Sequence, residues 1–198
     1  MYPSCIRDLI ECFKELPGIG EKSAERLAYA VVNFDKDRLD GFANALINIK
    51  NKIKRCPICN CITDMDSCYI CNDDNRDDDT IFVVEKSKDI LLFEKIGNYN
   101  GKYHVLDGLI SPMDGINPDD ININSLIDRV QKYRVKEVIV VLKPSIEGET
   151  TMQYIKKILS KYDVKVSKIP IGIPMGTDIE YIDTMTLEMA FEDRKDVA

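Results

Sequence analysis

Two cysteine pairs constrain this chain more than any other feature of its sequence. Cys56 and Cys59 form one C-x2-C knuckle, Cys68 and Cys71 form a second, and eight residues separate the two knuckles. Each knuckle lets two thiolates bind one ion from a tight turn, and two knuckles complete a closed tetrahedral shell with no open position for a substrate water. The spacing therefore predicts a structural four-thiolate zinc site at 56–72, which it favours over an iron–sulfur cluster.

The remaining three cysteines and the start of the chain indicate a reducing compartment. Seven cysteines is an odd number, and the N-terminus has no apolar signal segment, so a secreted disulfide scaffold is not expected. Cys61 breaks the symmetry of the two knuckles and is left out of the ligand set. Cys5 and Cys12 are expected to be buried as small apolar groups. No apolar run is long enough to span a membrane, and we expect a cytoplasmic, nucleoid-associated protein.

The formal net charge of −7 over 198 residues would by itself argue against nucleic-acid binding, because phosphates attract positive charge. The charge is, however, unevenly distributed along the chain. Residues 1–55 carry a net charge of +2, residues 56–80 carry −6, and residues 81–198 carry −3. Residues 73–79 read as a short acidic linker. Most of the negative charge thus belongs to the cysteine segment, and the first 55 residues are free to meet a different partner.

The first segment has the pattern of a helical hairpin. Apolar residues at helical spacing predict a helix from Ser4, the expected N-cap, to Leu16, and a second helix from Glu21 to about Val32. Pro17 ends the first helix, and Gly18 and Gly20 allow a tight turn.

The turn of this hairpin has the chemistry of a phosphate site. Glycines at a helix start leave backbone N–H groups free where the helix dipole is positive. Lys22 and Arg26 share one face just beyond the turn. Gly18, Gly20, Lys22 and Arg26 are therefore the predicted DNA-binding residues, against the alternative of an ordinary hairpin whose glycines only cap a helix.

A third helix is expected from Arg38 to Arg55. It is expected to place four apolar residues inward and to end in a basic tract that either complements the helix C-terminus or adds a secondary phosphate contact. The inward residues are Phe42, Leu46, Ile49 and Ile53, and the tract is Lys50, Lys52, Lys54 and Arg55.

From Thr80 onward, β-prone runs alternate with helical patterns, which predicts βα units and a mostly parallel sheet. Strands are expected at 81–84, 103–106, 137–142 and 164–169, and helices at 87–96, 124–133 and 149–162. The fold class is thus α/β: an N-terminal helix–hairpin–helix, a small four-cysteine zinc ribbon, and a C-terminal βα domain. His104, the only histidine, lies in a predicted strand and is expected to be structural.

Three carboxylates fall where strands of the predicted sheet end. Glu85 follows the first strand, and Glu147 and Glu149 follow the third. Ligands of parallel sheets gather at the carboxyl ends of the strands, so these acids are candidates for a Mg²⁺ site. The alternative is that Glu147 and Glu149 only begin a helix, and Lys143 beside them weakens the case for Mg²⁺. The layout resembles a Toprim domain, in which the pair is normally Asp-x-Asp.

The order of these parts resembles the RecR family of bacterial recombination mediators over nearly the whole chain. The motifs that carry the resemblance, besides the cysteine spacing, are Leu16-Pro-Gly-Ile-Gly20 with Lys22-Ser-Ala24, Val83-Val-Glu85, Tyr103-His-Val-Leu106, Ser111-Pro-Met-Asp-Gly115, Ile146-Glu-Gly-Glu149, Gly172-Ile-Pro-Met-Gly176 and Glu180-Tyr181. The chain departs from the family pattern in four places, at Leu142-Lys143-Pro144, Asp107, Gly176-Thr177 and Asp183-Thr184.

The resemblance implies a non-catalytic protein of DNA repair that binds DNA without sequence preference and forms a ring-like homotetramer. It implies cooperation with RecO and RecF to place the RecA recombinase on single-stranded or gapped DNA. Lys22 and Arg26 would then face DNA, the acidic Toprim surface of Glu85, Glu147 and Glu149 would face RecO, and residues 171–198 would help to build the subunit interface. The predicted regions are 1–55, 56–72, 80–170 and 171–198.

Two rival functions stay open on the sequence. One is a Mg²⁺-dependent Toprim nuclease or phosphotransferase that uses Glu85, Glu147 and Glu149. The other is a zinc-stabilised scaffold that binds only proteins.

Overall fold

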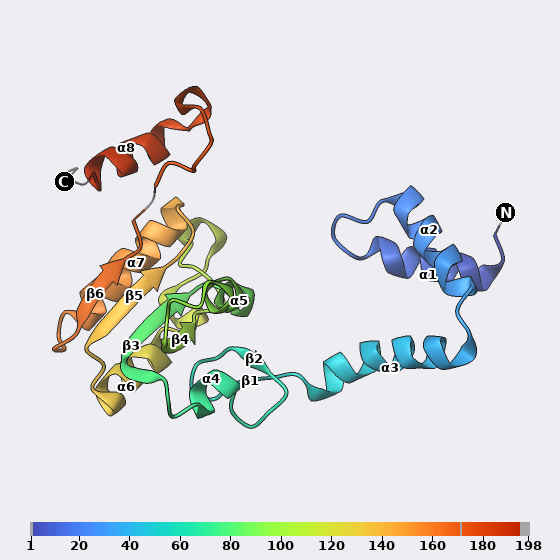
Figure 1. Ribbon diagram of the computed structural model, residues 1–198, viewed down its shortest axis with the longest axis horizontal. Coiled ribbons are helices and arrows are strands. Elements are labelled where there is room, and N and C mark those ends of the chain that lie inside the picture. The colour runs from blue at the N-terminus through green and yellow to red at the C-terminus, as the bar shows by residue number, and fades with distance from the viewer. Residues whose placement is uncertain (1, 171, 195–198) are drawn as a thin grey trace. The chain divides into compact units, whose positions relative to one another are not determined.

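The computed structural model describes residues 2–170 and 172–194, which form two compact units. The first unit ends at Ile53 and the second begins at Lys54 (Figure 1). The predicted segment 171–198 therefore falls partly outside the described residues, at residue 171 and at residues 195–198.

The first unit is the predicted helical hairpin followed by a third helix. α1 spans Ser4–Lys14, α2 spans Glu21–Val32 and α3 spans Lys36–Lys52. α1 and α2 pack on a small core of Ile10, Ala24 and Ala28, because alanines at i and i+4 give α2 a flat face that α1 can approach closely. Pro3, without a side-chain hydrogen bond, occupies the N-cap position that was predicted for Ser4.

Burial in this unit differs from the prediction at two places. Cys5 and Cys12 are exposed, because the buried stripe of α1 runs through Ile10 and its neighbours and the two cysteines lie off it. None of the described residues of α3 is buried, and the four side chains predicted to point inward are 39–59% exposed, at Phe42, Leu46, Ile49 and Ile53. The hairpin core does not include α3, whose Phe42 ring meets that of Phe34 edge-on at 6.3 Å between ring centroids.

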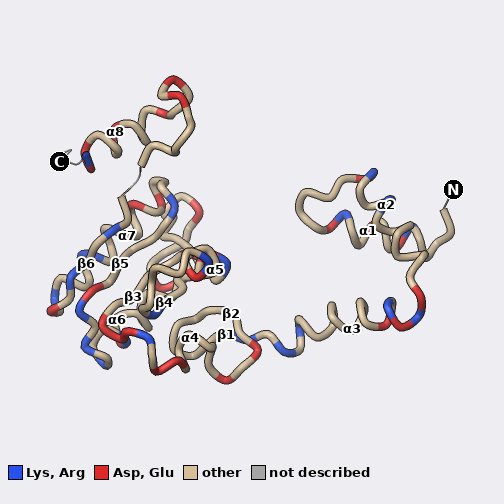
Figure 2. The backbone as a smooth tube through the Cα atoms, in the orientation of Figure 1, with Lys and Arg blue, Asp and Glu red and all other residues tan. Residues whose placement is uncertain are grey.

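The second unit begins with the cysteine module, which we define as residues 54–72. Strands β1 (Lys54–Arg55) and β2 (Ile62–Thr63) pair antiparallel, and the short helix α4 (Tyr69–Asn72) carries the end of the second knuckle. Asn60 adopts a positive φ of 63° between the strands, which a non-glycine residue tolerates best when it is asparagine or aspartate. Figure 2 shows the acidic residues gathered from β2 past α4 to the start of the next strand.

A four-stranded parallel sheet follows, as predicted. The strands are β3 (Asp77–Val84), β4 (Gly101–Val105), β5 (Glu137–Val141) and β6 (Lys165–Lys168), in the order β4-β3-β5-β6. Asp77, Asp78 and Asp79 belong to β3, so the acidic linker predicted for 73–79 is wrong in its second half. The pairing of β3 with β4 extends back to Asp77, with a register shift before Ile81.

Helices cover the sheet on both faces. α6 (Asn124–Tyr133) and α7 (Ile146–Leu159) pack on one face through a core that includes Ile81, Val83 and Val138. α5 (Ser87–Ile96) and the cysteines pack on the other, against Phe82 and Val84. Side chains alternate across a strand, so the apolar run predicted to be buried on both faces supplies both cores. The α/β fold class is confirmed.

Short helices complete the described chain. Two 3-10 turns, at Pro112–Asp114 and Pro118–Asp120, lie between β4 and α6, and a third spans Ile179–Tyr181. α8 spans Thr184–Glu192 and is capped by the carboxylate of Asp183. Of the helices described, none combines the length and the apolar character that crossing a membrane requires.

Candidate nucleic-acid interface and metal centre

The turn between α1 and α2 leaves a helix start open. Gly18 has φ +82°, a conformation that side chains rarely adopt, and a Cβ at Gly18 or Gly20 would meet no atom within 4 Å. Gly20 is the N-cap of α2 in an extended conformation, and no side chain caps the helix. The first N–H groups of α2 thus face open space at the positive end of the helix dipole, which is a site for an oxyanion.

Lys22 and Arg26 lie on α2 beyond this turn, and both are exposed. Among the described residues, neither forms a salt bridge, whereas Lys14 on α1 contacts the carboxylates of Glu11 at 3.0 Å and Glu21 at 2.8 Å. Ala24 and Ala28 fix the opposite face of α2 in the core. Two cations are therefore held outward next to the uncapped turn, which is the arrangement that phosphate contacts require.

The basic tract spans the end of α3 and strand β1, and its two residues in the second unit are paired with acids of that unit. Lys54 contacts Asp66 at 2.6 Å, and Arg55 pairs with Asp107. Asp107 has a positive φ of 62° and is one of the departures from the family pattern. Only Lys50 and Lys52 of the tract remain without a salt bridge to a described residue, which reduces the secondary phosphate contact predicted there.

The four predicted cysteines meet at one point. The sulfur atoms of Cys56, Cys59, Cys68 and Cys71 lie within 4.8 Å of one another, three of the residues are buried, and the fourth is half-buried. Within the part of the chain that is described, this is the one group of histidine, cysteine and acidic side chains placed to hold a metal ion. Four convergent thiols match the closed donor set of a structural metal site.

Backbone hydrogen bonds shape the metal centre. The N–H of Cys68 donates to Cys56 Sγ and the N–H of Cys71 donates to Cys68 Sγ, each at 3.4 Å. The N–H of Cys56 donates to the carbonyl of Cys61 at 2.8 Å, and Cys61 itself is buried beside the ligands. The sulfur atoms perturb one another: contact with Cys59 and other sulfurs holds the pKa of Cys68 well below its usual range and raises the pKa of Cys71.

A buried polar network joins the metal centre to the sheet. The ammonium of Lys102 on β4 donates to the carbonyls of Ile70 at 3.1 Å and Asp73 at 2.7 Å. The carbonyl of Cys59 accepts from the N–H of Val105 at 2.8 Å. Sequence reasoning missed Lys102, although a lysine inside an otherwise apolar strand signals a buried polar contact.

The predicted acidic residues do not form a metal-binding group. Glu85 follows β3 and contacts its neighbour Lys86 at 3.3 Å. Glu147 and Glu149 lie in the first turn of α7, which Ser145 caps by accepting from the N–H of Gly148 at 3.2 Å. The alternative that this pair begins a helix therefore describes the local structure. The predicted convergence of the three carboxylates is not found among the described residues.

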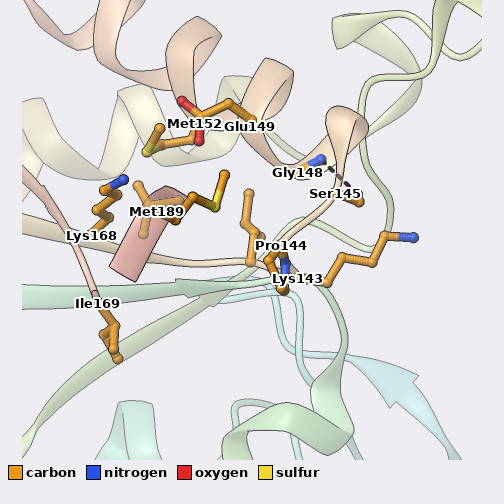
Figure 3. Close-up of a pocket in the computed structure, with 11 residues that line it drawn as sticks. Lys143, Pro144, Ser145, Gly148, Glu149, Met152, Lys168, Ile169 and Met189 are labelled. Carbon is orange, nitrogen blue, oxygen red and sulfur yellow. Dashed lines mark hydrogen bonds between the residues drawn. The ribbon is translucent and has the colours of Figure 1, made fainter. Parts of the chain in front are cut away.

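Local contacts explain the state of the α7 acids. A hydrogen bond from Ser145, followed by nearby backbone and Lys143, lowers the pKa of Glu147, and Gln153 donates to Glu149 at 2.7 Å. A small cavity of about 40 Å³ lies at the end of β5 and is lined by Glu149, Lys143 and Lys168 among others. Figure 3 shows these side chains. Both glutamates are partly exposed, as surface carboxylates at a helix start are.

His104 has a structural place, as predicted. Its ring is fully buried, Nε2 lies 2.8 Å from the carbonyl of Asn122, and burial lowers its pKa to about 4. The ring is neutral at neutral pH and faces no reacting group.

Comparison with known proteins agrees with the order of these parts. Residues 6–50 match the family model of the RecR helix-hairpin-helix, residues 79–170 match that of the Toprim domain, and residues 172–195 match that of the RecR C-terminal region. The chain is 45% identical over 196 residues to the recombination protein RecR of Natranaerobius thermophilus, which covers 99% of this chain and 98% of that protein. A full-length match at this identity shows the family, and with it a role in DNA recombination and repair. The chain belongs to the RecR family of recombination proteins.

Proposed function

We propose that the chain is a non-catalytic mediator that binds DNA through the α1–α2 hairpin and helps to load RecA on single-stranded or gapped DNA, together with RecO and RecF. The observation that carries the DNA-binding part is the uncapped start of α2, with Lys22 and Arg26 exposed beside it and not paired with a described acid. Such a site grips phosphates without reading bases.

A ring-like homotetramer would raise the DNA affinity that this small site provides. One hairpin offers few phosphate contacts, and the whole chain is negatively charged, so a single subunit binds DNA weakly. Linked subunits raise the effective concentration of each further contact. The exposed apolar face of α3 supports self-association, because apolar patches on a soluble domain mark interaction surfaces.

The acids at the ends of β3 and β5 fit a protein partner better than a metal. Glu85, Glu147 and Glu149 do not group as ligands among the described residues, and Lys143 adds a positive charge nearby. We assign this acidic Toprim surface to contact with RecO. Mg²⁺ is not required by this function, and we assign the ion of the four-cysteine centre as structural Zn²⁺.

We assign one role of the proposed function to each of the four predicted regions. Residues 1–55 bind DNA, residues 56–72 hold the metal, residues 80–170 carry the partner surface, and residues 171–198 contribute to the subunit interface. Metal analysis of the purified chain tests the zinc assignment, with one Zn²⁺ per chain expected and loss of the ion expected in Cys56→Ser.

The DNA-binding test compares Lys22→Ala/Arg26→Ala with Lys156→Ala/Lys157→Ala, a matched removal of two cations from the last turn of α7. Affinity for a labelled single strand is measured by fluorescence anisotropy over a range of salt concentrations. We expect the hairpin variant to bind more weakly and to lower the salt slope by about two for each subunit in contact. Equal binding by the hairpin variant and the unmodified chain would refute the assignment of Lys22 and Arg26.

The nuclease alternative has its own test. DNA and RNA are incubated with the chain and Mg²⁺, and the products are compared with those of Glu147→Gln. We expect no cleavage above the level of the variant. Cleavage that requires Mg²⁺ and disappears in Glu147→Gln would replace the mediator by the enzyme, whereas absence of all DNA binding at low salt would favour the scaffold.

Mass in solution tests the ring. We expect a multimer of four chains, measured by light scattering with and without DNA. A monomer in both states contradicts the ring but leaves the hairpin assignment to the anisotropy experiment.

A further inference from the structure

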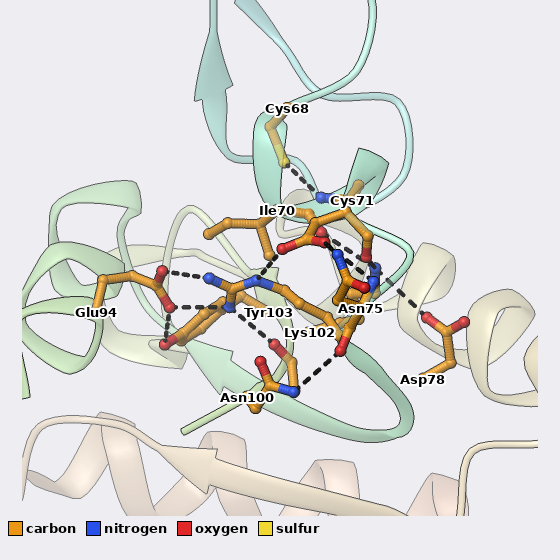
Figure 4. Close-up of polar contacts among 12 residues, drawn as sticks. Cys68, Ile70, Cys71, Asn75, Asp78, Glu94, Asn100, Lys102 and Tyr103 are labelled. Carbon is orange, nitrogen blue, oxygen red and sulfur yellow. Dashed lines mark hydrogen bonds and ion pairs between the residues drawn. The ribbon is translucent and has the colours of Figure 1, made fainter. Parts of the chain in front are cut away.

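Three basic side chains, two buried and one mostly buried, lie where the cysteine module meets the sheet, and two of the three have acidic partners. Arg76 Nη1 donates to Glu94 at 3.0 Å and to the carbonyl of Gly101 at 3.2 Å. Lys102, besides its two carbonyl contacts, lies 3.6 Å from a carboxylate oxygen of Asp78. Figure 4 shows Lys102 with the side chain of Asp78 and the backbone of Ile70 around it. Each charge is therefore compensated, as burial of a cation requires.

Arg129 on α6 is the third, and it lacks such a partner. Its side chain is as buried as that of Lys102, at 6% and 5% exposed. Its Nη1 donates to the carbonyl of Tyr103, and no carboxylate of the described residues forms a salt bridge with it. A buried cation without a counter-ion is expensive, because the guanidinium gives up hydration and gains no opposite charge.

Arg129 lines two cavities. One, of about 190 Å³, is lined by Lys102, Ile58 and Tyr133 among others. The other, of about 210 Å³, is lined by Ser125 and Lys132 and again by Ile58 and Tyr133. A single water needs only about 10–15 Å³ measured in this way, so either cavity has room for a small polar ligand.

The contact with Tyr103 does not explain the charge of Arg129. β4 is an edge strand, and its outward carbonyl groups need donors. A neutral amide serves this purpose at Val105, whose carbonyl accepts from Asn60 and Asn122, each at 3.1 Å. At Tyr103, the donor to the backbone carbonyl is the guanidinium of Arg129. A neutral donor would satisfy this carbonyl equally well, so the edge strand does not account for the positive charge of Arg129.

We propose that the cavities beside Arg129 form a binding site for one carboxylate group. A guanidinium presents several N–H donors in a planar fork that matches a carboxylate. The rim favours a single negative charge over a phosphate dianion, because Asp74, Asp78 and Asp128 line the cavities and are exposed. This site lies apart from the α1–α2 hairpin and does not depend on DNA binding.

The site is tested on the metal-loaded full chain by the NMR signals of arginine Nε–H groups. Sodium acetate is titrated against sodium chloride at constant ionic strength and neutral pH, and the Arg129 signal is assigned by its absence in Arg129→Lys. We expect a saturable shift of this signal with acetate and none with chloride. A linear shift, or the same shift with both salts, overturns the proposal.

Variants at the rim keep the test sharp if Arg129→Lys fails to fold. Asp128→Asn removes a repelling charge and is expected to tighten acetate binding about three-fold, and Lys132→Gln is expected to weaken it about three-fold. Arg134→Gln, at the C-cap of α6 two residues after Lys132 and outside the lining residues, is the matched control without effect. Equal affinities in all three variants would also overturn the site.

Two further probes identify the source of the carboxylate. Inorganic phosphate is expected to bind more weakly than acetate, and tighter phosphate binding contradicts the carboxylate assignment. A blocked Gly-Glu-Gly peptide that binds at least ten-fold more tightly than acetate identifies an acidic segment of a polypeptide as the ligand. Affinity for acetate that equals or exceeds that of the peptide identifies a small carboxylate.

Discussion

The two units of this chain stabilise themselves in different ways. The second unit has a parallel sheet with a core on each face and a metal centre packed on one of them. The first unit has a core of one isoleucine and two alanines, and its longest helix buries nothing. Small cores give little hydrophobic stabilisation. The second unit therefore buries much more apolar surface within itself than the first unit does.

Metal removal is expected to produce the largest difference in stability between the two units. Structural zinc contributes about 10 kcal/mol or more to the folding of small zinc modules. A chelator should therefore abolish amide-exchange protection around residues 56–72 and lower it along β4, while α1 and α2 keep theirs. Loss of the metal with unchanged protection at 56–72 would contradict a metal-dependent fold.

The next largest effect compares one ion pair from each unit. Glu94→Gln breaks a pair whose side chains are 12% and 20% exposed, Arg76 and Glu94, and breaking a buried pair costs about 3 kcal/mol. Lys14→Gln breaks two surface ion pairs of the first unit, with Glu11 and Glu21, and should leave the unfolding free energy unchanged within error. Urea unfolding of both variants measures the contrast. Equal effects would mean that the network at the cysteine module is no more than a surface pair.

Acid should destabilise the second unit through His104. Its folded pKa of about 4 lies below the unfolded value of 6.5, so the unfolded chain takes up the proton first as pH falls. The stabilisation by the neutral ring is complete above pH 6.5 and is lost as pH falls from 6.5 toward 4. Between pH 7 and pH 5 this amounts to about 2 kcal/mol. His104→Gln should flatten the pH dependence of urea unfolding in that range, and an unchanged slope would contradict the shift.

The smallest effect on the folding of one chain is expected on α3. Leu46 and Ile49 are 59% and 58% exposed, so Leu46→Ser and Ile49→Ser should change the unfolding free energy of the monomer by less than about 0.5 kcal/mol. The same variants should weaken self-association in sedimentation experiments. Lys36→Ser at the start of the helix is the control, and unchanged association in the leucine and isoleucine variants would show that this face is not an interface.

The sequence predicted what depends on short-range pattern. α5 and α6 begin and end where their apolar periodicity places them, and the cysteine spacing located the metal centre. What it could not predict depends on long-range packing. Phe42 and Leu46 have the periodicity of a core face, but periodicity does not say whether a partner element lies in the same unit.

The candidate sites follow the same division. The site proposed at Lys22 and Gly18 depends on a local turn, which the sequence predicted. Arg129 occupies a core position of α6, one residue from buried Val130, and only the fold reveals that it turns toward the edge of β4. A charged residue inside the apolar stripe of a helix is the signal that would have identified it.

The cysteine module covers the edge strand β4, and this affects the risk that a newly made chain aggregates. An uncovered edge strand is a template for pairing with other chains, and here the cover includes a knuckle that needs a metal to hold its shape. The chain emerges with the ligands first and β4 afterwards. If the metal is the proposed zinc, a chain made without it is expected to expose β4 to pairing with other chains, so its abundance is expected to fall when the metal is scarce.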